Sequence, residues 1–167
     1  MNSGATISEC GLYRMDLFRI VSKPTAEPIE IVYVGVNPST AGPLNDDQTI
    51  AKLREFTRRS GAFKFSIVNL FAYRSTDVKE LAKVSDPVGK LNNRAISDAL
   101  ARSDIVVPMW GSRNKLPKVL WPRIDEVVDG IRRSNKLVMT FGFTKTGDPK
   151  HPLMLGYDTK LTLWNLE

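Results

Sequence analysis

An asparagine, a proline and a serine directly follow a run of apolar residues early in the chain. Residues 29–34 (IEIVYV) are succeeded by Gly35, Asn37, Pro38 and Ser39. This pattern is typical of a buried strand that ends in a tight polar loop. In open α/β proteins, ligands bind just beyond the carboxyl ends of the strands, so Asn37 is placed to contact a ligand. Its amide both donates and accepts hydrogen bonds, and it can hold a water molecule or the edge of a base.

The only histidine, His151, lies in a second loop, which Pro149 and Pro152 stiffen. A stiffened loop presents a side chain in a fixed position. A neutral imidazole can donate a hydrogen bond to an oxygen on which negative charge develops, and an imidazolium can stabilise that charge electrostatically. We therefore expect Asn37 and His151 to be the catalytic pair. The alternatives are that Asn37 belongs to a plain turn and that the lone histidine has no function.

Three further polar residues are candidates, Asn69 and the weaker Asp46 and Asp47, and each also has a structural explanation. Asn69 ends the apolar stretch FKFSIVNLF. A buried amide there is costly unless it is hydrogen-bonded or faces a cleft. The alternative to a binding role is that the Asn69 side chain only caps the end of the strand. Asp46 and Asp47 follow the Asn37 loop; one of them would cap a helix, and the other could position water or a cation.

Several chemistries lack the residues they need. The chain has one histidine and one cysteine, Cys10, which excludes a zinc site of the usual kind. The GxxxxGK[ST] and GxGxxG loops of nucleotide hydrolysis and dinucleotide redox chemistry are missing, and so is the GxSxG elbow of hydrolases. We expect no metal and no cofactor.

Length and composition favour one domain over residues 1–167, since no Pro/Gly/Ser-rich linker divides the chain. The lone Cys10 allows no intramolecular disulfide and fits a reducing compartment. The first thirty residues carry charges throughout and do not read as a secretion signal, and no apolar run approaches the ~20 residues that span a bilayer. We expect a soluble, cytoplasmic protein.

The formal net charge is +6, which favours a polyanionic partner such as nucleic acid. The basic residues gather in residues 52–74 and 113–150. Solvated helix faces are the alternative explanation for these clusters. No interaction with a membrane is expected.

Apolar segments alternate with helical patterns along the chain. Central strands are predicted at residues 29–34, 63–71, 104–109 and 136–141, with short edge strands at 12–20 and 161–164. Helices are predicted after Asp46-Asp47, after Asp86-Pro87 and from Pro122, with a short one from Thr76 or Asp77 to Leu81. The order predicts an α/β protein: a three-layer α/β/α fold with a central, mainly parallel four-stranded sheet. Right-handed crossovers would gather the strand-end loops on one rim.

Four motifs in order, VGVNPSTAG, IVNLF, MWGS and HPL, resemble the uracil-DNA glycosylase superfamily over residues 30–156. The strings NPSTA, DD-x-T-I, NLFAYRST, DPVG-x-x-N and T-x-x-G-x-P-x-HP look more closely like a family of uncharacterised domains found in bacteria and phages. The glycosylase resemblance implies a uracil-DNA-glycosylase-like fold. It also implies that Asn37 positions water, that Asn69 reads the base edge and that His151 polarises the base carbonyl.

By the same resemblance, the substrate would be lined by Gly35, Pro38, Ser39, Phe71, Trp110, Gly111 and Pro152. Tyr73 is a second candidate for a stacking aromatic, and Arg74 lies in the same loop. The chain departs from the glycosylases at Ser39, where they usually have Gly or Tyr, and at Leu153, where they have Ser.

The sequence thus suggests a nucleobase-processing enzyme of DNA repair or modification. The leading hypothesis is a monofunctional N-glycosylase acting on a uracil-like or modified pyrimidine in DNA. Such an enzyme extrudes its target nucleotide from the duplex, which a basic rim would help to hold. One alternative is a non-catalytic protein that binds nucleic acid or nucleotide with a glycosylase-like fold. The other is an enzyme whose target is a free nucleotide or nucleoside.

Overall fold

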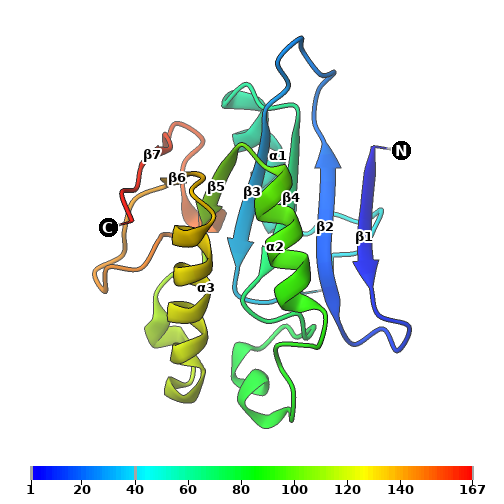
Figure 1. Cartoon of the computed structure of the whole chain (residues 1–167), viewed down its shortest axis with the longest axis vertical. Coiled ribbons are helices and arrows are strands. Elements are labelled where there is room, and N and C mark those ends of the chain that lie inside the picture. The colour runs from blue at the N-terminus through cyan, green and yellow to red at the C-terminus, as the bar shows by residue number, and fades with distance from the viewer. Residues whose placement is uncertain (1, 40, 167) are drawn as a thin grey trace.

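The computed structural model describes residues 2–39 and 41–166, and within them seven strands form one sheet (Figure 1). The strands are β1 (Ser3–Ile7), β2 (Arg14–Ile20), β3 (Glu30–Gly35), β4 (Lys64–Asn69), β5 (Ile105–Pro108), β6 (Leu137–Thr140) and β7 (Thr162–Leu163). The α-helices are α1 (Gln48–Arg59), α2 (Asn92–Arg102) and α3 (Trp121–Arg133). Short 3-10 helices are η1 (Val78–Lys83), η2 (Arg113–Lys115), η3 (Lys118–Leu120) and η4 (Pro152–Met154).

The strand order is β1-β2-β4-β3-β5-β6-β7, and the sheet is mixed. Strand β3 pairs parallel with β4 and β5, and β5 pairs parallel with β6. Strands β1, β2 and β7 pair antiparallel with their neighbours. The α/β class is confirmed. The prediction was of four central, mainly parallel strands with short edge strands, and the sheet that forms has seven strands and is mixed. Strand β1 escaped prediction because its sequence, SGATI, lacks the alternating apolar residues that mark a strand.

Helices cover both faces of the sheet, which explains why β3 is an apolar run without polar alternation. Val32 and Val34 pack in one core cluster with residues of α2 and α3. Ile31 and Tyr33 pack on the opposite face with residues of α1. Figure 1 shows α2 and α3 side by side before the sheet and α1 behind it.

The chain changes direction across the sheet between β3 and β5. From β3 it passes through α1 to β4 on one side, and from β4 it returns through α2 to β5 on the other side of β3. This is a topological switch point, where α/β proteins commonly bind ligands beyond the carboxyl ends of the strands. Those ends lie at the lower edge in Figure 1, toward which the β3 arrow points.

The helix starts follow local chemistry. Helix α1 is capped by Asp47, whose carboxylate accepts a hydrogen bond from the Ile50 N–H at 2.9 Å, as expected for one of the two aspartates. The predicted start of α2 at Asp86 is wrong, because Asp86 accepts from the Gly89 N–H at 2.8 Å within a turn and Gly89 has a φ of +85°. That conformation is not helical, so α2 begins only at Asn92. In the described part of the chain, no helix has the length and apolarity needed to cross a membrane.

Candidate functional site

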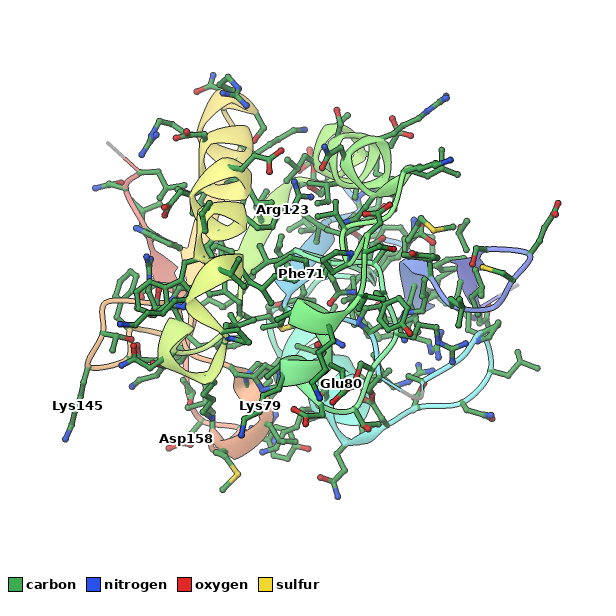
Figure 2. All side chains as sticks on the ribbon, turned by 90° about the horizontal axis from the view of Figure 1, so that it is seen from below. Phe71, Lys79, Glu80, Arg123, Lys145 and Asp158 are labelled. Carbon is green, nitrogen blue, oxygen red and sulfur yellow. The ribbon has the colours of Figure 1, made fainter. Side chains whose placement is uncertain are left out.

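A cavity of about 270 Å³ lies at the carboxyl ends of β3, β4 and β5. The loops predicted to converge contribute Asn37, Asn69, Trp110, Gly111 and His151 to its wall. Figure 2 looks at the molecule from this side. Helix α1 closes the cavity with its first turn, since Thr49 and Ile50 also line it. Segments far apart in the sequence therefore meet at the switch point.

A larger groove of about 500 Å³ lies between α2 and α3. Its wall combines apolar side chains such as Ile96 and Val127 with polar ones from the two helices, and it includes none of the residues that the sequence singled out. We place the candidate site in the smaller cavity, because that is where polar side chains from separate strand ends converge.

Asn37 holds two loops together. Its Nδ2 donates to the Ser75 carbonyl at 2.8 Å and to the Pro38 carbonyl at 3.1 Å. The Ser75 N–H in turn donates to the Pro38 carbonyl at 2.9 Å. Because the amide nitrogen is engaged, the group that Asn37 offers a ligand or a water molecule is its Oδ1, an acceptor to which no described residue donates.

Asn69 is a buried amide with an unused donor. Only 3% of the residue is exposed, and its Nδ2 has no hydrogen-bond partner among the described residues. A Cβ added at Gly35 would lie 2.8 Å from the Asn69 Oδ1, so glycine at position 35 makes room for this side chain. An unsatisfied buried donor is costly, and a ligand acceptor reaching it would recover that cost.

His151 is held in one neutral tautomer. Its Nδ1 accepts a hydrogen bond from the Leu153 N–H at 3.3 Å, which leaves the proton on Nε2. Burial lowers the pKa of His151, and nearby Lys115 lowers it further, while Asp47 opposes them. The His151 ring is therefore a neutral Nε2–H donor at neutral pH. The Gly111 N–H fixes this loop by donating to the Pro149 carbonyl at 2.8 Å.

The two aspartates after the Asn37 loop have different positions. Asp47 lines the cavity, but one carboxylate oxygen caps α1 and the other accepts from the Ser39 hydroxyl at 2.8 Å. Asp46 lies outside the cavity and pairs with Arg19 and Arg54. Among the described lining residues Asp47 is the one carboxylate, and both of its oxygens are engaged.

Several predicted substrate-binding residues are not brought to the cavity. Phe71 is 1% exposed and packs in the core beneath α2 and α3, near the middle of the view in Figure 2. Tyr73 packs edge-on against the ring of Tyr13, at a centroid distance of 5.6 Å. Arg74 donates to the Gly11 carbonyl in a neighbouring groove. Pro38 and Pro152 are buried beside the cavity and do not line it.

Arg14 is a lining residue that the sequence analysis missed. It opens β2 and is 3% exposed. Alternation along LYRMDLFRI gave no reason to place an arginine inside the protein, and its position depends on a β-bulge in the β1–β2 pair. Lys115, from η2, is the other cation of the wall. The sequence signal for a buried arginine here would have been the presence of two arginines, Arg14 and Arg19, in a predicted strand whose other residues are partly alternating apolar ones.

The basic cluster around α1 is largely neutralised. Arg54 pairs with Asp46, Arg58 and Arg59 pair with Glu55, and Lys64 pairs with Glu30. These contacts favour the interpretation of a solvated, ion-paired helix face over a continuous positive surface. Elsewhere in the described residues, no three His, Cys, Asp or Glu side chains gather closely enough to hold a metal ion.

Comparison with protein families matches the chain to the family described as "Protein of unknown function (DUF1643)", over residues 14–153. The protein belongs to this family. The expected membership in a family of uncharacterised domains is thereby confirmed. No curated protein and no solved structure matches the chain. The matched range includes every residue of the cavity wall named above.

Proposed function

We propose that this DUF1643 protein is a monofunctional N-glycosylase that acts on a uracil-like or modified pyrimidine in DNA. The observation that carries the proposal is the meeting of Asn37, Asn69 and His151 in one cavity of about 270 Å³. This volume is below the range of about 300–1,000 Å³ typical of pockets for drug-sized ligands, and it suits a single extruded base. The order of the four motifs along the chain supports the same proposal.

The residues would act mainly on the leaving base. As the N-glycosidic bond breaks, its electron pair moves to the base, and negative charge develops on a base carbonyl oxygen. The Nε2–H of His151 would donate to that oxygen, and a fixed donor in a partly buried site stabilises such charge strongly. The unused Nδ2 donor of Asn69 would bind a second acceptor on the base edge.

Water activation would be weak by comparison. The Asn37 Oδ1 could orient a water molecule toward the sugar carbon, where the water oxygen forms the new bond and its proton is released. An amide is a poor base, and the one carboxylate of the described wall, Asp47, is hydrogen-bonded through both oxygens. Stabilisation of the departing base is therefore the larger part of the proposed mechanism.

The same engagement of Asn37 and Asp47 favours a second candidate, a non-catalytic protein that binds a base or nucleotide. In that case the Asn37 amide only holds the 38 and 75 loops together through its bonds to Pro38 and Ser75. The cavity would still bind a ligand through Asn69 and His151, with no water-activating step.

An oligonucleotide panel tests the proposal. DNA carrying uracil, 5-hydroxymethyluracil and other altered pyrimidines would be assayed for abasic-site formation with the wild type, Asn37→Ala, His151→Ala and His151→Gln. We expect the wild type to release at least one base and His151→Ala to lose this activity. His151→Gln should keep part of the activity, because glutamine keeps an N–H donor. Turnover that survives both alanine substitutions contradicts the assigned roles. Binding without release of any base favours the non-catalytic candidate.

A further inference from the structure

Arg14 is a buried cation to which the described residues offer no anionic partner. It is 3% exposed, and none of the described carboxylates lies within ion-pair distance of its guanidinium. Its Nη1 donates to the Ala41 carbonyl at 2.7 Å, and its Nε is buried with no hydrogen-bond partner among the described residues. Burial lowers the pKa of Arg14 to about 10, with some opposition from Asp47, so the side chain remains charged at neutral pH. A buried, unpaired charge is one of the most costly features a fold can retain.

A β-bulge directs this side chain to the cavity. In the pairing of β1 with β2, Thr6 is opposite Asp16 and Ile7 is opposite Arg14, so Met15 is an extra residue. Arg14 and Arg19 are five residues apart and would face opposite sides of a regular strand. Because of the bulge, both guanidinium groups reach the loop before α1, where they donate to the Ala41 and Gly42 carbonyls. Bulges often redirect side chains beside functional sites.

The wall around Arg14 lacks a group that would neutralise it. Lys115 adds a second cation, while Asn69 and His151 present donors. Asp47, the one carboxylate of the described wall, is already bonded to Ser39 and to the first turn of α1. The described wall therefore has two cations and one carboxylate that is already hydrogen-bonded, which suits an anionic, oxygen-rich group.

We propose that Arg14 is the receptor for a negatively charged oxygen group, a carboxylate or a phosphate, carried by the pyrimidine ligand of this cavity. Guanidinium groups bind both anions through parallel hydrogen bonds, and Arg14 has one nitrogen committed to a described residue. The inference rests on the proposed function for the pyrimidine part of the ligand and names its class: a pyrimidine bearing an acid group, or a single pyrimidine nucleotide.

Arg14 supplies charge for a single anionic group, not for a row of phosphates. A nucleic acid held along its backbone needs several free cations in a row. Three of the four cations of α1 are ion-paired, Arg54 with Asp46 and Arg58 and Arg59 with Glu55. Figure 2 shows Lys79 and Lys145 well apart from each other. Arg14 and Lys115, by contrast, line the cavity itself.

Isothermal titration calorimetry on the full chain tests this inference with matched pairs of ligands. The pairs are uracil with its 6-carboxylate, orotate, and deoxyuridine with its 5′-monophosphate; inorganic phosphate is titrated alone. We expect the charged member of at least one pair to bind about tenfold or more tightly than its neutral partner. Which pair shows the preference distinguishes a carboxylate on the base from a phosphate on the sugar.

Two variants locate the effect. Arg14→Gln should abolish the preference for the charged ligand, whereas Lys79→Gln, which removes an exposed charge at the same edge, should leave it intact. Equal binding of both members of every pair by the wild type overturns the inference, and this comparison stands even if Arg14→Gln does not fold. A preference that survives in folded Arg14→Gln overturns it as well.

The outcome is separable from that of the proposed glycosylase activity. Release of a neutral base from oligonucleotides, with the same turnover in Arg14→Gln, would overturn the anion receptor and keep the glycosylase. Anion binding that depends on Arg14, with no base released from any substrate, would keep the receptor and overturn the glycosylase.

Discussion

Two arginines of strand β2, Arg14 and Arg19, are both buried but differ in their hydrogen-bond and ion-pair partners. Arg19 is fully buried, and its guanidinium bonds Asp46 at 2.8 Å and the carbonyls of Phe18, Gly42 and Asn45. Arg14 is almost as deeply buried, yet it bonds one carbonyl and no described carboxylate. Arg19 shows that this fold can satisfy a buried guanidinium completely. The incomplete satisfaction of Arg14, which lines the cavity, therefore points to a ligand.

The comparison also separates stability from binding. Removing one partner of a satisfied buried cluster leaves the other groups unpaired, whereas removing an unpaired buried charge relieves a cost. Substitutions at the two positions should thus have opposite consequences, even though the residue type, the strand and the burial are the same.

The largest effect is expected for Arg19→Met. The substitution leaves Asp46 without its buried partner and three backbone carbonyls without a donor, so the free energy of unfolding should fall by about 3–5 kcal/mol. Urea denaturation at pH 7, followed by circular dichroism, measures this change. A loss below about 1 kcal/mol would mean that the Arg19 cluster contributes little, and the contrast with Arg14 would disappear.

Arg14→Met should change stability far less. Loss of the bond to Ala41 is offset by removal of an unpaired buried charge, so we expect the free energy of unfolding to stay within about 1 kcal/mol of the wild type, and it can rise. The same urea titration provides the comparison with Arg19→Met. A destabilisation as large as that of Arg19→Met would show that Arg14 is structural and would weaken the argument for an anionic ligand.

Asp46→Asn tests how much the partner of Arg19 contributes to stability. Burial raises the pKa of Asp46, but hydrogen bonds from Arg54 and Arg19 outweigh it and bring the pKa below its usual value. The carboxylate should therefore stabilise the protein above about pH 4, and this contribution should be lost as the pH falls through the lower pKa of the folded state. Replacement by asparagine should cost about 1–2 kcal/mol at pH 7 in the wild type.

A double-mutant cycle provides the control for Asp46. In the Arg19→Met background the Asp46→Asn substitution should cost less, because the buried partner of Asp46 is already gone. Urea titrations of the four proteins at pH 7 and pH 3.5 give both the coupling and its pH dependence. Equal costs in both backgrounds would assign the role of Asp46 to Arg54 alone.

The smallest effect is expected for Lys115→Gln, which tests how the Lys115 charge acts on His151 in the cavity wall. Burial, then Lys115, lower the pKa of His151, so this substitution should raise that pKa. The change should be small, because Lys115 is exposed and its charge is screened by salt. NMR titration of the imidazole measures the shift. Since the folded pKa lies below the ordinary value, His151 favours folding above about pH 6.5. That contribution to the free energy of unfolding is lost as the pH falls through the pKa of the folded state. An imidazole titration that is the same in Lys115→Gln as in the wild type would show that Lys115 does not act on the ring.

Much of the fold was predictable because its signals are local. The apolar runs that became β3, β4, β5 and β6 were identified, and so was the convergence of Asn37, Asn69 and His151 at the strand ends. Right-handed crossovers make that convergence follow from the order of the elements. The start of α2 was missed because Asp86-Pro87 resembles a helix cap, whereas Gly89 turns the chain there.

The sequence by itself determined the α/β class and which polar residues stand at strand ends, since both depend on short-range apolar patterns and turn chemistry. Only the tertiary structure decided that Phe71 packs in the core and that Asp46 pairs with arginines. It also decided that Arg14 enters the cavity wall, because a single bulged residue changes the side of the strand that a side chain faces. No periodicity in one strand reveals the register of its neighbour, and that register is what leaves one buried arginine satisfied and the other open to a ligand.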